Sequence, residues 1–267
     1  GAYTGRWLGD GEAWEALFAS GTLMAEATAR KALGSAKVDV VVQPAAEQRK
    51  RLLVADMDFT IIEQECLDVL AVRAGVGKEV AALTRRAMAG EIDFAFALAE
   101  RVELLAGQPE SLLEKVYDAE ISLRPGARTV VATMRASGAA TALVSGGFRF
   151  FTERVAAAAG FDEVNGNDFE IERGFLTGRI DGPVVGAQAK LDMLKSLAAQ
   201  RGMPLAATLA VGDGANDIPM LRAAGLGVAV HAKPAVRRAT VARIEHAGLV
   251  GLLYLQGYHR EEFVEID

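Results

Sequence analysis

Four short apolar runs constrain the fold of this 267-residue chain more than any other feature. They lie at residues 52–55, 141–144, 208–211 and 227–230, and each is apolar nearly throughout. A strand with one face in water alternates apolar and polar residues, whereas a uniformly apolar strand is covered on both faces. Longer amphipathic stretches separate the runs, as in sheets whose strands are connected by helices. The pattern predicts an α/β core with a Rossmann-like, doubly wound parallel sheet.

The spacing of the first two runs predicts an insertion. Residues 56–140 lie between them, far more than a single crossover helix requires. The stretch 80–119 has helical periodicity and few strand-forming residues, so we expect a small helical cap. Further along, "FEIERGFLTGRI" at 169–180 predicts a β-hairpin, because a glycine separates two strand-like pieces. The predicted boundaries are 73–123 for the cap and 50–72 with 124–267 for the core.

Residues 1–49 differ in character from the rest of the chain. The stretch 21–44 predicts one helix followed by one strand, which is too little for an independent hydrophobic core. The basic "QRKR" at 48–51 reads as a solvated link. We interpret residues 1–49 as a small αβ segment with a packing or dimer-forming role, so a homodimer is one expectation.

Composition excludes several classes of protein. The 29 basic and 35 acidic side chains give a net charge of −6, which disfavours non-specific association with nucleic acids. Cys66 is alone, so the chain can form neither an internal disulfide nor a cysteine metal cluster. No apolar run approaches the roughly 18 residues of a membrane span, and the opening does not resemble a secretory signal. We expect a soluble, cytoplasmic protein with neither a nucleic-acid nor a membrane partner.

Polar residues directly follow three of the apolar runs. Asp56 and Asp58 follow the first run, Ser145 the second and Asp213 the third. Ligands of open α/β sheets bind beyond the carboxyl ends of the strands, so these residues are expected to converge. Two neighbouring carboxylates suit a divalent metal, and one of them can act as nucleophile while the other transfers protons. The alternative, a surface turn or helix cap, fits poorly after four consecutive apolar residues.

Two glycine-rich turns add to this chemistry. Ser145, Gly146 and Gly147 precede a helical stretch, where backbone N–H groups can hold an oxyanion, although a plain strand-to-helix turn has the same appearance. "GDGAND" places Asp213 and Asp217 in a second turn, whose carboxylates are hard oxygen ligands of the kind that Mg²⁺ prefers. The sequence therefore predicts an anion-binding turn beside an acidic metal site.

The order of the motifs points to a known family. An Asp-x-Asp-x-Thr strand end, a Ser-Gly-Gly strand end, a lysine and Gly-Asp-Gly-x-x-Asp together resemble the four motifs of the haloacid dehalogenase (HAD) superfamily. Within it, "DMDFTIIEQECLDVLA", "AMAGEIDFAFALAERVELL", "LRPG", "SGGF", "LTG" and "GDGANDIPML" resemble the phosphoserine phosphatases over residues 50–258. The resemblance implies Mg²⁺-dependent hydrolysis of O-phospho-L-serine through an aspartyl-phosphate, the last step of serine biosynthesis.

The resemblance also implies a role for each motif residue. Asp56 corresponds to the nucleophile and Asp58 to the general acid and base. The Mg²⁺ ligands would be the Asp56 carboxylate, the Asp58 backbone carbonyl and Asp213. The phosphoryl oxygens would be held by Lys190, Ser145, Gly146 and Gly147, with Asn216 nearby. Asp217 would orient Lys190 or a metal-bound water. Taken alone, Lys190 reads as a solvated lysine on a helix.

Four further residues correspond to the family's substrate pocket. Glu65 stands where the family binds the substrate ammonium, and Arg101 where it binds the carboxylate, a pairing that suits an α-amino acid. Met88 corresponds to an apolar lid and Phe94 to a packing aromatic. Without the motif register, Glu65 reads as a helix N-terminal charge, Arg101 as a surface residue, and Met88 and Phe94 as core of the cap.

One residue departs from the family pattern, and two other functions stay open. Phe59 stands where the family usually has serine, and we expect its ring to pack away from the substrate. The first alternative is a phosphatase or phosphotransferase that acts on another small phosphomonoester or uses homoserine as acceptor. The second, less favoured because the catalytic set is intact, is a serine-binding regulatory protein in which residues 1–49 are a reduced form of the family's ACT-like module.

Overall fold

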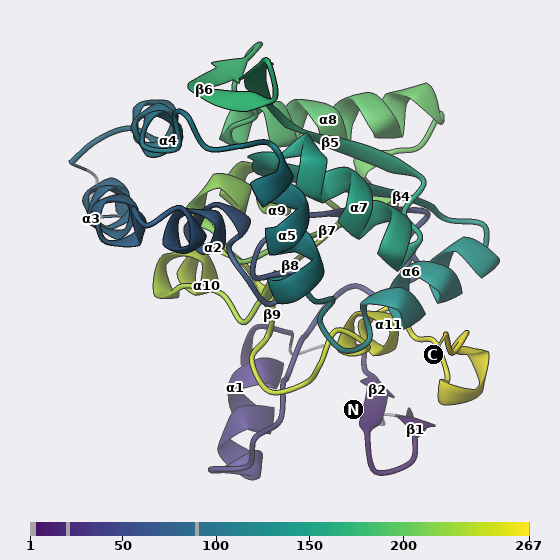
Figure 1. Cartoon of the computed structure of the whole chain (residues 1–267). Helices are drawn as coiled ribbons and strands as arrows, with labels where there is room; N and C mark the ends of the chain where they lie inside the picture. The colour runs from purple at the N-terminus through teal and green to yellow at the C-terminus, as the bar shows by residue number, and fades with distance from the viewer. Residues whose placement is uncertain (1–3, 20–21, 89–90, 267) are drawn as a thin grey trace.

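A seven-stranded sheet forms the centre of the computed structural model, which describes residues 4–19, 22–88 and 91–266. The strand order is β6-β5-β4-β3-β7-β8-β9 (Figure 1). All neighbouring pairs are parallel except β5 and β6, which are antiparallel. The strands are β3 (Leu52–Ala55), β4 (Ala140–Phe148), β5 (Glu163–Glu172), β6 (Phe175–Asp181), β7 (Thr208–Gly212), β8 (Leu226–Val230) and β9 (Ala242–Ile244). The predicted α/β fold with a mostly parallel sheet is confirmed.

Helices cover both faces of the sheet, which explains the uniformly apolar strands. Leu53 and Ala55 of β3 pack in one apolar cluster, whereas Leu52 and Val54 pack in the other. Full burial of one such side chain contributes about 1.5–3 kcal/mol. The first cluster contains residues of α6 (Ala127–Ala136), α7 (Arg149–Ala159) and α11 (Gly251–Leu255). The second contains residues of α8 (Ala187–Gln200), α9 (Ile218–Ala223) and α10 (Pro234–Ala239). Three short 3-10 turns are η1 (Leu205–Ala207), η2 (Ala215–Asp217) and η3 (Arg260–Glu262).

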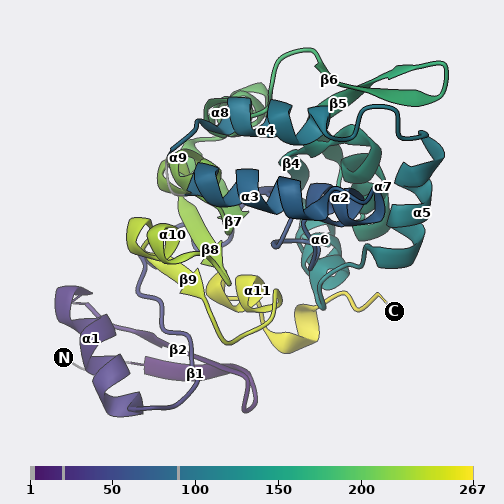
Figure 2. The ribbon, with the colours of Figure 1, turned by 60° about the vertical axis from the view of Figure 1, so that its left-hand side comes forward.

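The predicted helical insertion lies between β3 and α6 and is confirmed as helical. It consists of α2 (Cys66–Arg73), α3 (Gly77–Met88), α4 (Phe94–Glu103) and α5 (Ser111–Glu120), which group together at one side of the sheet (Figures 1 and 2). The two connections to the core run side by side, because Ile62 and Leu123 form an antiparallel bridge. Cys66, at the start of α2, is a buried free thiol. The exact cap boundaries, 73–123, stay a prediction.

The β5–β6 hairpin, predicted at 169–180, joins this cap to the core at a second place. Near the hairpin tip, the Gly107 N–H donates to the Leu176 carbonyl (2.8 Å) and the Leu176 N–H donates to the Gln108 carbonyl (2.9 Å). The Glu110 N–H donates to the Gly174 carbonyl (2.9 Å). Backbone hydrogen bonds of this kind fix the strand register as well as the distance. The cap is therefore held at both its connections and its α4–α5 loop.

The N-terminal segment differs from the prediction. It contains an antiparallel pair, β1 (Thr4–Gly9) and β2 (Ala13–Leu17), followed by α1 (Thr22–Leu33), beside β9 and α11 (Figures 1 and 2). The strand expected within 21–44 is wrong: after α1, residues 36–44 form neither a helix nor a strand in the described part of the chain. Instead, the Asp39 carboxylate accepts hydrogen bonds from the backbone N–H groups of Glu245, His246 and Ala247. The Asp39 side chain, and not a ladder of backbone hydrogen bonds, therefore attaches this segment to the residues that follow β9.

Three expectations for the whole chain remain predictions. None of the helices in the described ranges is both long and apolar enough to cross a membrane. The location in the cell, the dimer and the role of residues 1–49 stay as predicted from the sequence.

The hairpin contact with the cap can be tested at two glycines. Both Gly178 and Gly174 have positive φ, but only at Gly178 would a Cβ meet other atoms, 2.9 Å from Ala106 Cβ and 3.1 Å from the Glu103 carbonyl. Gly178→Ala is expected to lower the free energy of unfolding by about 2–4 kcal/mol, because backbone strain and overpacking add. Gly174→Ala should cost only about 1–2 kcal/mol. Urea unfolding of both variants measures the difference, and equal losses would contradict packing at Gly178.

Candidate active site

The predicted catalytic residues converge at the carboxyl ends of the central strands. Asp56 directly follows β3, Ser145 lies in β4, Asp213 follows β7, and Asp217 ends η2. Lys190 comes from the first turn of α8 and is fully buried, although the sequence alone favours a solvated lysine. The doubly wound fold brings these segments to one edge of the sheet.

Lys190 links two of the carboxylates. Its Nζ lies 2.5 Å from Asp56 Oδ1 and 2.6 Å from Asp217 Oδ1. Burial alone would lower the pKa of Lys190, but the carboxylates of Asp217 and Asp56 raise it above its ordinary value. The two carboxylates thus favour the charged form of Lys190, and its two short contacts hold Asp56 and Asp217 in fixed positions.

The acidic side chains outnumber the buried cation. Oxygens of Asp56, Asp213 and Asp217 lie within 4.8 Å of one another, and all three residues are buried. Burial raises the pKa of Asp56 well above its ordinary value, and the nearby Asp217 carboxylate adds to the effect. Burial likewise raises the pKa of Asp213 to about 6, although Lys233 opposes this shift. One ammonium against three close carboxylates leaves excess negative charge that a hard divalent cation would neutralise, so the donor set fits such an ion.

Asp58 contacts the glycine-rich turn formed by residues 145–147. Its Oδ2 accepts a hydrogen bond from Ser145 Oγ (3.3 Å), and its Oδ1 accepts one from the Cys66 N–H (2.9 Å). Burial raises the pKa of Asp58 above its ordinary value, while the hydrogen bonds from Cys66 and Ser145 oppose the shift. Ser145 Oγ in turn accepts a hydrogen bond from the Gly147 N–H (2.9 Å). This carboxyl group can hold a proton at a higher pH than an exposed aspartate.

The cap closes directly over the same turn. A Cβ at Gly146 would lie 3.0 Å from Phe94 Cζ, and one at Gly186 would lie 3.7 Å from Phe94 Cδ1. Phe94 is 37% exposed, so part of the residue also faces solvent. Asn216 is half-buried, with Nδ2 3.8 Å from the Cβ position of Gly146. The structure thus brings Phe94 and Asn216 to the anion-binding turn.

Arg101 of α4 is buried within the cap, near enough to Glu65 to influence its charge. Arg101 is only 8% exposed, and its Nε has no hydrogen-bond partner. Its polar contacts are long, with Nη1 3.4 Å from Thr84 Oγ1 and 3.9 Å from Asp68 Oδ1. Burial raises the pKa of Glu65 well above its ordinary value, Asp58 adds to the effect and Arg101 opposes it. A buried guanidinium without a close carboxylate is costly and has unused hydrogen-bonding capacity.

Two predicted positions have separate outcomes. Met88 is the last residue of α3, but its side chain lies outside the described part of the structure. Phe59 adopts a left-handed backbone conformation with φ 52°, which is uncommon for a bulky residue. Its ring is 38% exposed, and Lys233 Nζ lies 5.8 Å from the ring centroid. That the ring packs away from the substrate stays a prediction.

Two polar residues at the site were not found by sequence reasoning. Lys233 Nζ lies 3.8 Å from Asp213 Oδ2, and Lys233 follows β8, so the strand-end rule applied to Asp56 could have found it. Asn167 lies within β5 and hydrogen-bonds to the Gly146 carbonyl (2.7 Å). It has no spacing or motif relation to the other residues, so only the fold places it there.

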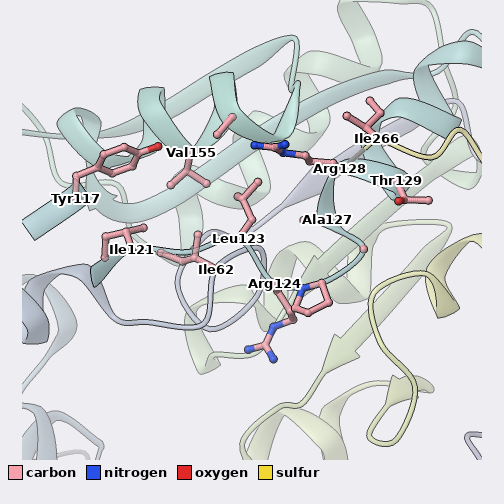
Figure 3. A pocket seen from close by; sticks show the side chains of 13 residues that line it. Ile62, Tyr117, Ile121, Leu123, Arg124, Ala127, Arg128, Thr129, Val155 and Ile266 are labelled. Atoms are coloured by element: carbon pink, nitrogen blue, oxygen red, sulfur yellow. The ribbon is translucent and has the colours of Figure 1, made fainter. Parts of the chain in front are cut away.

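A separate hollow of about 360 Å³ lies where the cap connections meet the core. Ile62 and Leu123 from the two connections, Tyr117 of α5 and Val155 of α7 line it (Figure 3). None of the predicted site residues lines this hollow, so it is distinct from the site built around Asp56.

Comparison with known proteins agrees with the geometry. Residues 53–222 match the family model described as haloacid dehalogenase-like hydrolase. The chain belongs to this family. It is 45% identical over 232 residues to the phosphoserine phosphatase SerB2 of Mycobacterium tuberculosis. The matched region covers 86% of this chain and 56% of that protein. The chain spans only 56% to 63% of the length of three curated relatives that it matches at 44% to 45% identity.

Solved structures of this family extend the similarity to the fold. A substrate-bound phosphoserine phosphatase complex matches with a TM-score of 0.73 at 35% identity, covering 77% of this chain and 98% of that one. A phospho-aspartyl intermediate analogue of phosphoserine phosphatase matches with a TM-score of 0.72, at the same identity and coverage. The HAD core and the helical insertion are therefore shared with these proteins.

The raised pKa of Asp213 predicts how stability depends on pH in metal-free protein. Between its ordinary value of 3.8 and about 6, the folded state binds a proton that the unfolded state releases. The stability that Asp213 contributes should therefore fall as the pH rises through this window, by up to about 3 kcal/mol. Denaturant unfolding of the parent and of Asp213→Asn measures this loss. The free energy of unfolding of the parent, minus that of the variant, should decrease between pH 4 and 6.5.

A thermal shift with Mg²⁺ completes this test. At pH 7.5, Mg²⁺ should raise the Tm of the parent but have little effect on Asp213→Asn, because a cation offsets the carboxylate repulsion only where the ligand is present. A stability difference that is constant with pH, or equal Mg²⁺ shifts in both proteins, would contradict this assignment.

Proposed function

We propose that the protein is a Mg²⁺-dependent phosphoserine phosphatase, which hydrolyses O-phospho-L-serine to L-serine and phosphate. The observation that carries the proposal is the buried arrangement of Asp56 and Lys190, with Asp58 across the Ser145–Gly147 turn and the Glu65–Arg101 pair under the cap. The similarity to phosphoserine phosphatases over most of the chain supports the same reaction. Phosphoserine would be a small-molecule partner of this site.

Asp56 would attack the phosphorus atom and form an aspartyl-phosphate. The phosphate monoester dianion repels an incoming carboxylate, so cationic groups must offset that charge first. Lys190, 2.5 Å from Asp56 Oδ1, holds the nucleophile and supplies one such charge. Bound Mg²⁺, held by the Asp56 carboxylate, the Asp58 backbone carbonyl and Asp213, would supply further charge neutralisation. Asp217 would keep Lys190 in place through its 2.6 Å contact.

Asp58 would move the protons. Burial raises its pKa, so the carboxyl can be protonated when substrate binds and can donate to the serine oxygen as the phosphorus–oxygen bond breaks. The resulting carboxylate then accepts a proton from the water that attacks the aspartyl-phosphate. That second step frees Asp56 and returns Asp58 to its starting state.

Glu65 and Arg101 would bind the amino acid head group. The Nε of Arg101 is buried without a partner, and an incoming carboxylate would satisfy the guanidinium with charge-assisted hydrogen bonds. The raised pKa of Glu65 means that a substrate ammonium would favour its ionised form on binding. Phe94 would close over the turn that holds the phosphoryl group. Each part of phosphoserine would thus meet a complementary side chain.

A substrate panel tests the reaction and the nucleophile. With Mg²⁺, the parent should release phosphate from phospho-L-serine far faster than from phosphoethanolamine or a sugar phosphate, and chelation should stop the reaction. Asp56→Asn should abolish turnover while leaving the Tm near that of the parent, because the amide is similar in size but is a poor nucleophile.

Three outcomes of this panel would contradict the proposal. Retained activity in Asp56→Asn would exclude Asp56 as nucleophile. Equal rates across the panel would exclude phosphoserine specificity. Formation of phosphohomoserine when homoserine is present, in preference to free phosphate, would favour the phosphotransferase alternative.

Arg101 gives a sharper test of substrate choice. Arg101→Met should lower kcat/KM for phosphoserine by roughly 100- to 1,000-fold, because a desolvated charge pair is lost, yet change phosphoethanolamine hydrolysis only a few-fold. Arg86→Met is the control, since Arg86 is exposed and pairs with Glu91 on the same cap. Steady-state kinetics on both substrates measure the ratio. Equal losses on both substrates would show that Arg101 does not contact the carboxylate.

A further inference from the structure

Asn167 is a buried amide whose two polar ends connect two parts of the site. It is 2% exposed in β5, and its Nδ2 donates to the Gly146 carbonyl at 2.7 Å. Its Oδ1 accepts a hydrogen bond from the Val185 N–H at 2.8 Å. Because a carbonyl only accepts and a backbone N–H only donates, the orientation of the amide is fixed by its partners.

The first contact sets the direction of a catalytic N–H group. Gly146 C=O and Gly147 N–H belong to one peptide unit, and no cis peptide occurs among the described residues, so the two groups point in opposite directions. With the carbonyl held by Asn167, the Gly147 N–H points to Ser145 Oγ, 2.9 Å away. A Cβ at Gly147 would lie 2.9 Å from Asp58 Oδ2, so this peptide borders the catalytic carboxyl.

The second contact reaches the helix that carries Lys190. Val185 immediately precedes Gly186, the N-cap of α8, and the Gly186 carbonyl accepts the Lys190 N–H at 3.1 Å. The Val185 carbonyl also lies 3.3 Å from the Cβ position of Gly146. The Asn167 side chain thus links the start of α8 to the turn at Gly146 through two hydrogen bonds.

Phe94 of the cap packs against the surface that Asn167 holds together. Its ring approaches both Gly146 and Gly186, one residue from each of the two segments. A glycine peptide that is not held can rotate, because glycine lacks the steric limits of other residues. Rotation would turn the Gly147 N–H away from the site and would displace the surface on which the cap closes.

We propose that Asn167 is a positioning residue for phosphoryl transfer, which orients the Gly146–Gly147 peptide so that its N–H holds the Ser145 hydroxyl in place at the phosphoryl site, and aligns this turn with Lys190. The proposal rests on the proposed function, in which that turn binds the phosphoryl group. Asn167 itself does not touch the reacting atoms.

Asn167→Leu tests the proposal with a matched control on the neighbouring strand. Leucine is similar in size but lacks both polar ends. The control is Thr141→Val in β4: Thr141 is also buried, its Oγ1 donates to Asp162 Oδ2 (2.9 Å) and accepts from the Asp162 N–H (3.1 Å), and it lies at the other end of the strand. Both variants lose two buried hydrogen bonds, so both should have a lower Tm.

Only the Asn167 variant should lose anion binding. With Mg²⁺ present, calorimetric titration with inorganic phosphate should give at least about ten-fold weaker binding for Asn167→Leu. Its kcat/KM for phosphoserine should fall about 100-fold, in the range seen when one oxyanion donor is removed. Thr141→Val should match the parent in both measurements. Phosphate affinity within two-fold of the parent in Asn167→Leu, with a Tm loss like that of Thr141→Val, would overturn the proposal.

Asn167→Asp provides a second test if the leucine variant does not fold. A protonated carboxyl can donate to the Gly146 carbonyl as the amide does, whereas an ionised carboxylate repels it, and both forms accept from Val185. We therefore expect the kcat/KM of Asn167→Asp, divided by that of the parent, to fall as the pH rises. Taking the ratio cancels the titrations that are common to both proteins. A ratio that is independent of pH and close to one would overturn the proposal.

Failure of the proposed function would look different. A parent that binds inorganic phosphate but hydrolyses no phosphoserine would contradict the enzymatic assignment, while the ratio of phosphate affinities would still decide the role of Asn167.

Discussion

The buried ammonium of Lys190 is the interaction on which the site depends. It is fully buried and contacts both Asp56 and Asp217. A buried lysine is tolerated only where carboxylates compensate for the loss of water, and here the compensation comes from two separate strand ends. The sheet must therefore bring β3, the turn after β7 and the start of α8 to one point, which fixes the relative register of three segments distant in the sequence.

The same contact leaves a charge imbalance that the chemistry can use. Lys190 neutralises only part of the charge of Asp56, Asp213 and Asp217, and burial keeps that excess from being screened by water. A divalent cation would balance this excess, as the three carboxylates and the one ammonium leave two negative charges. The pKa of Asp58 is also raised, mainly by burial. Burial thus raises the pKa values of Asp56, Asp213 and Asp58, the residues proposed to hold the metal and to transfer the proton.

The cap supplies the other half of the site because it is held at two places. The Ile62–Leu123 bridge joins its connections, and the backbone pairing of residues 107–110 with the β5–β6 hairpin holds the opposite end. Phe94 can then lie over Gly146 and Gly186, while Arg101 is buried near Glu65 without a close carboxylate. Under the proposed function, the head group of the substrate and its phosphoryl group would therefore bind to separate elements that two fixed contacts align.

The sequence by itself determined the sheet, the insertion and the convergence of the polar strand-end residues, because uniformly apolar strands must be buried on both faces and polar strand ends must converge. It failed in the stretch 21–44, where the strand expected after the helix does not form among the described residues. Only the tertiary structure decided that Lys190 is buried, that Lys233 approaches Asp213, and that Asn167 holds the Gly146 carbonyl. These three depend on distances between segments far apart in the chain, and such distances exist only after the sheet and its helices have packed.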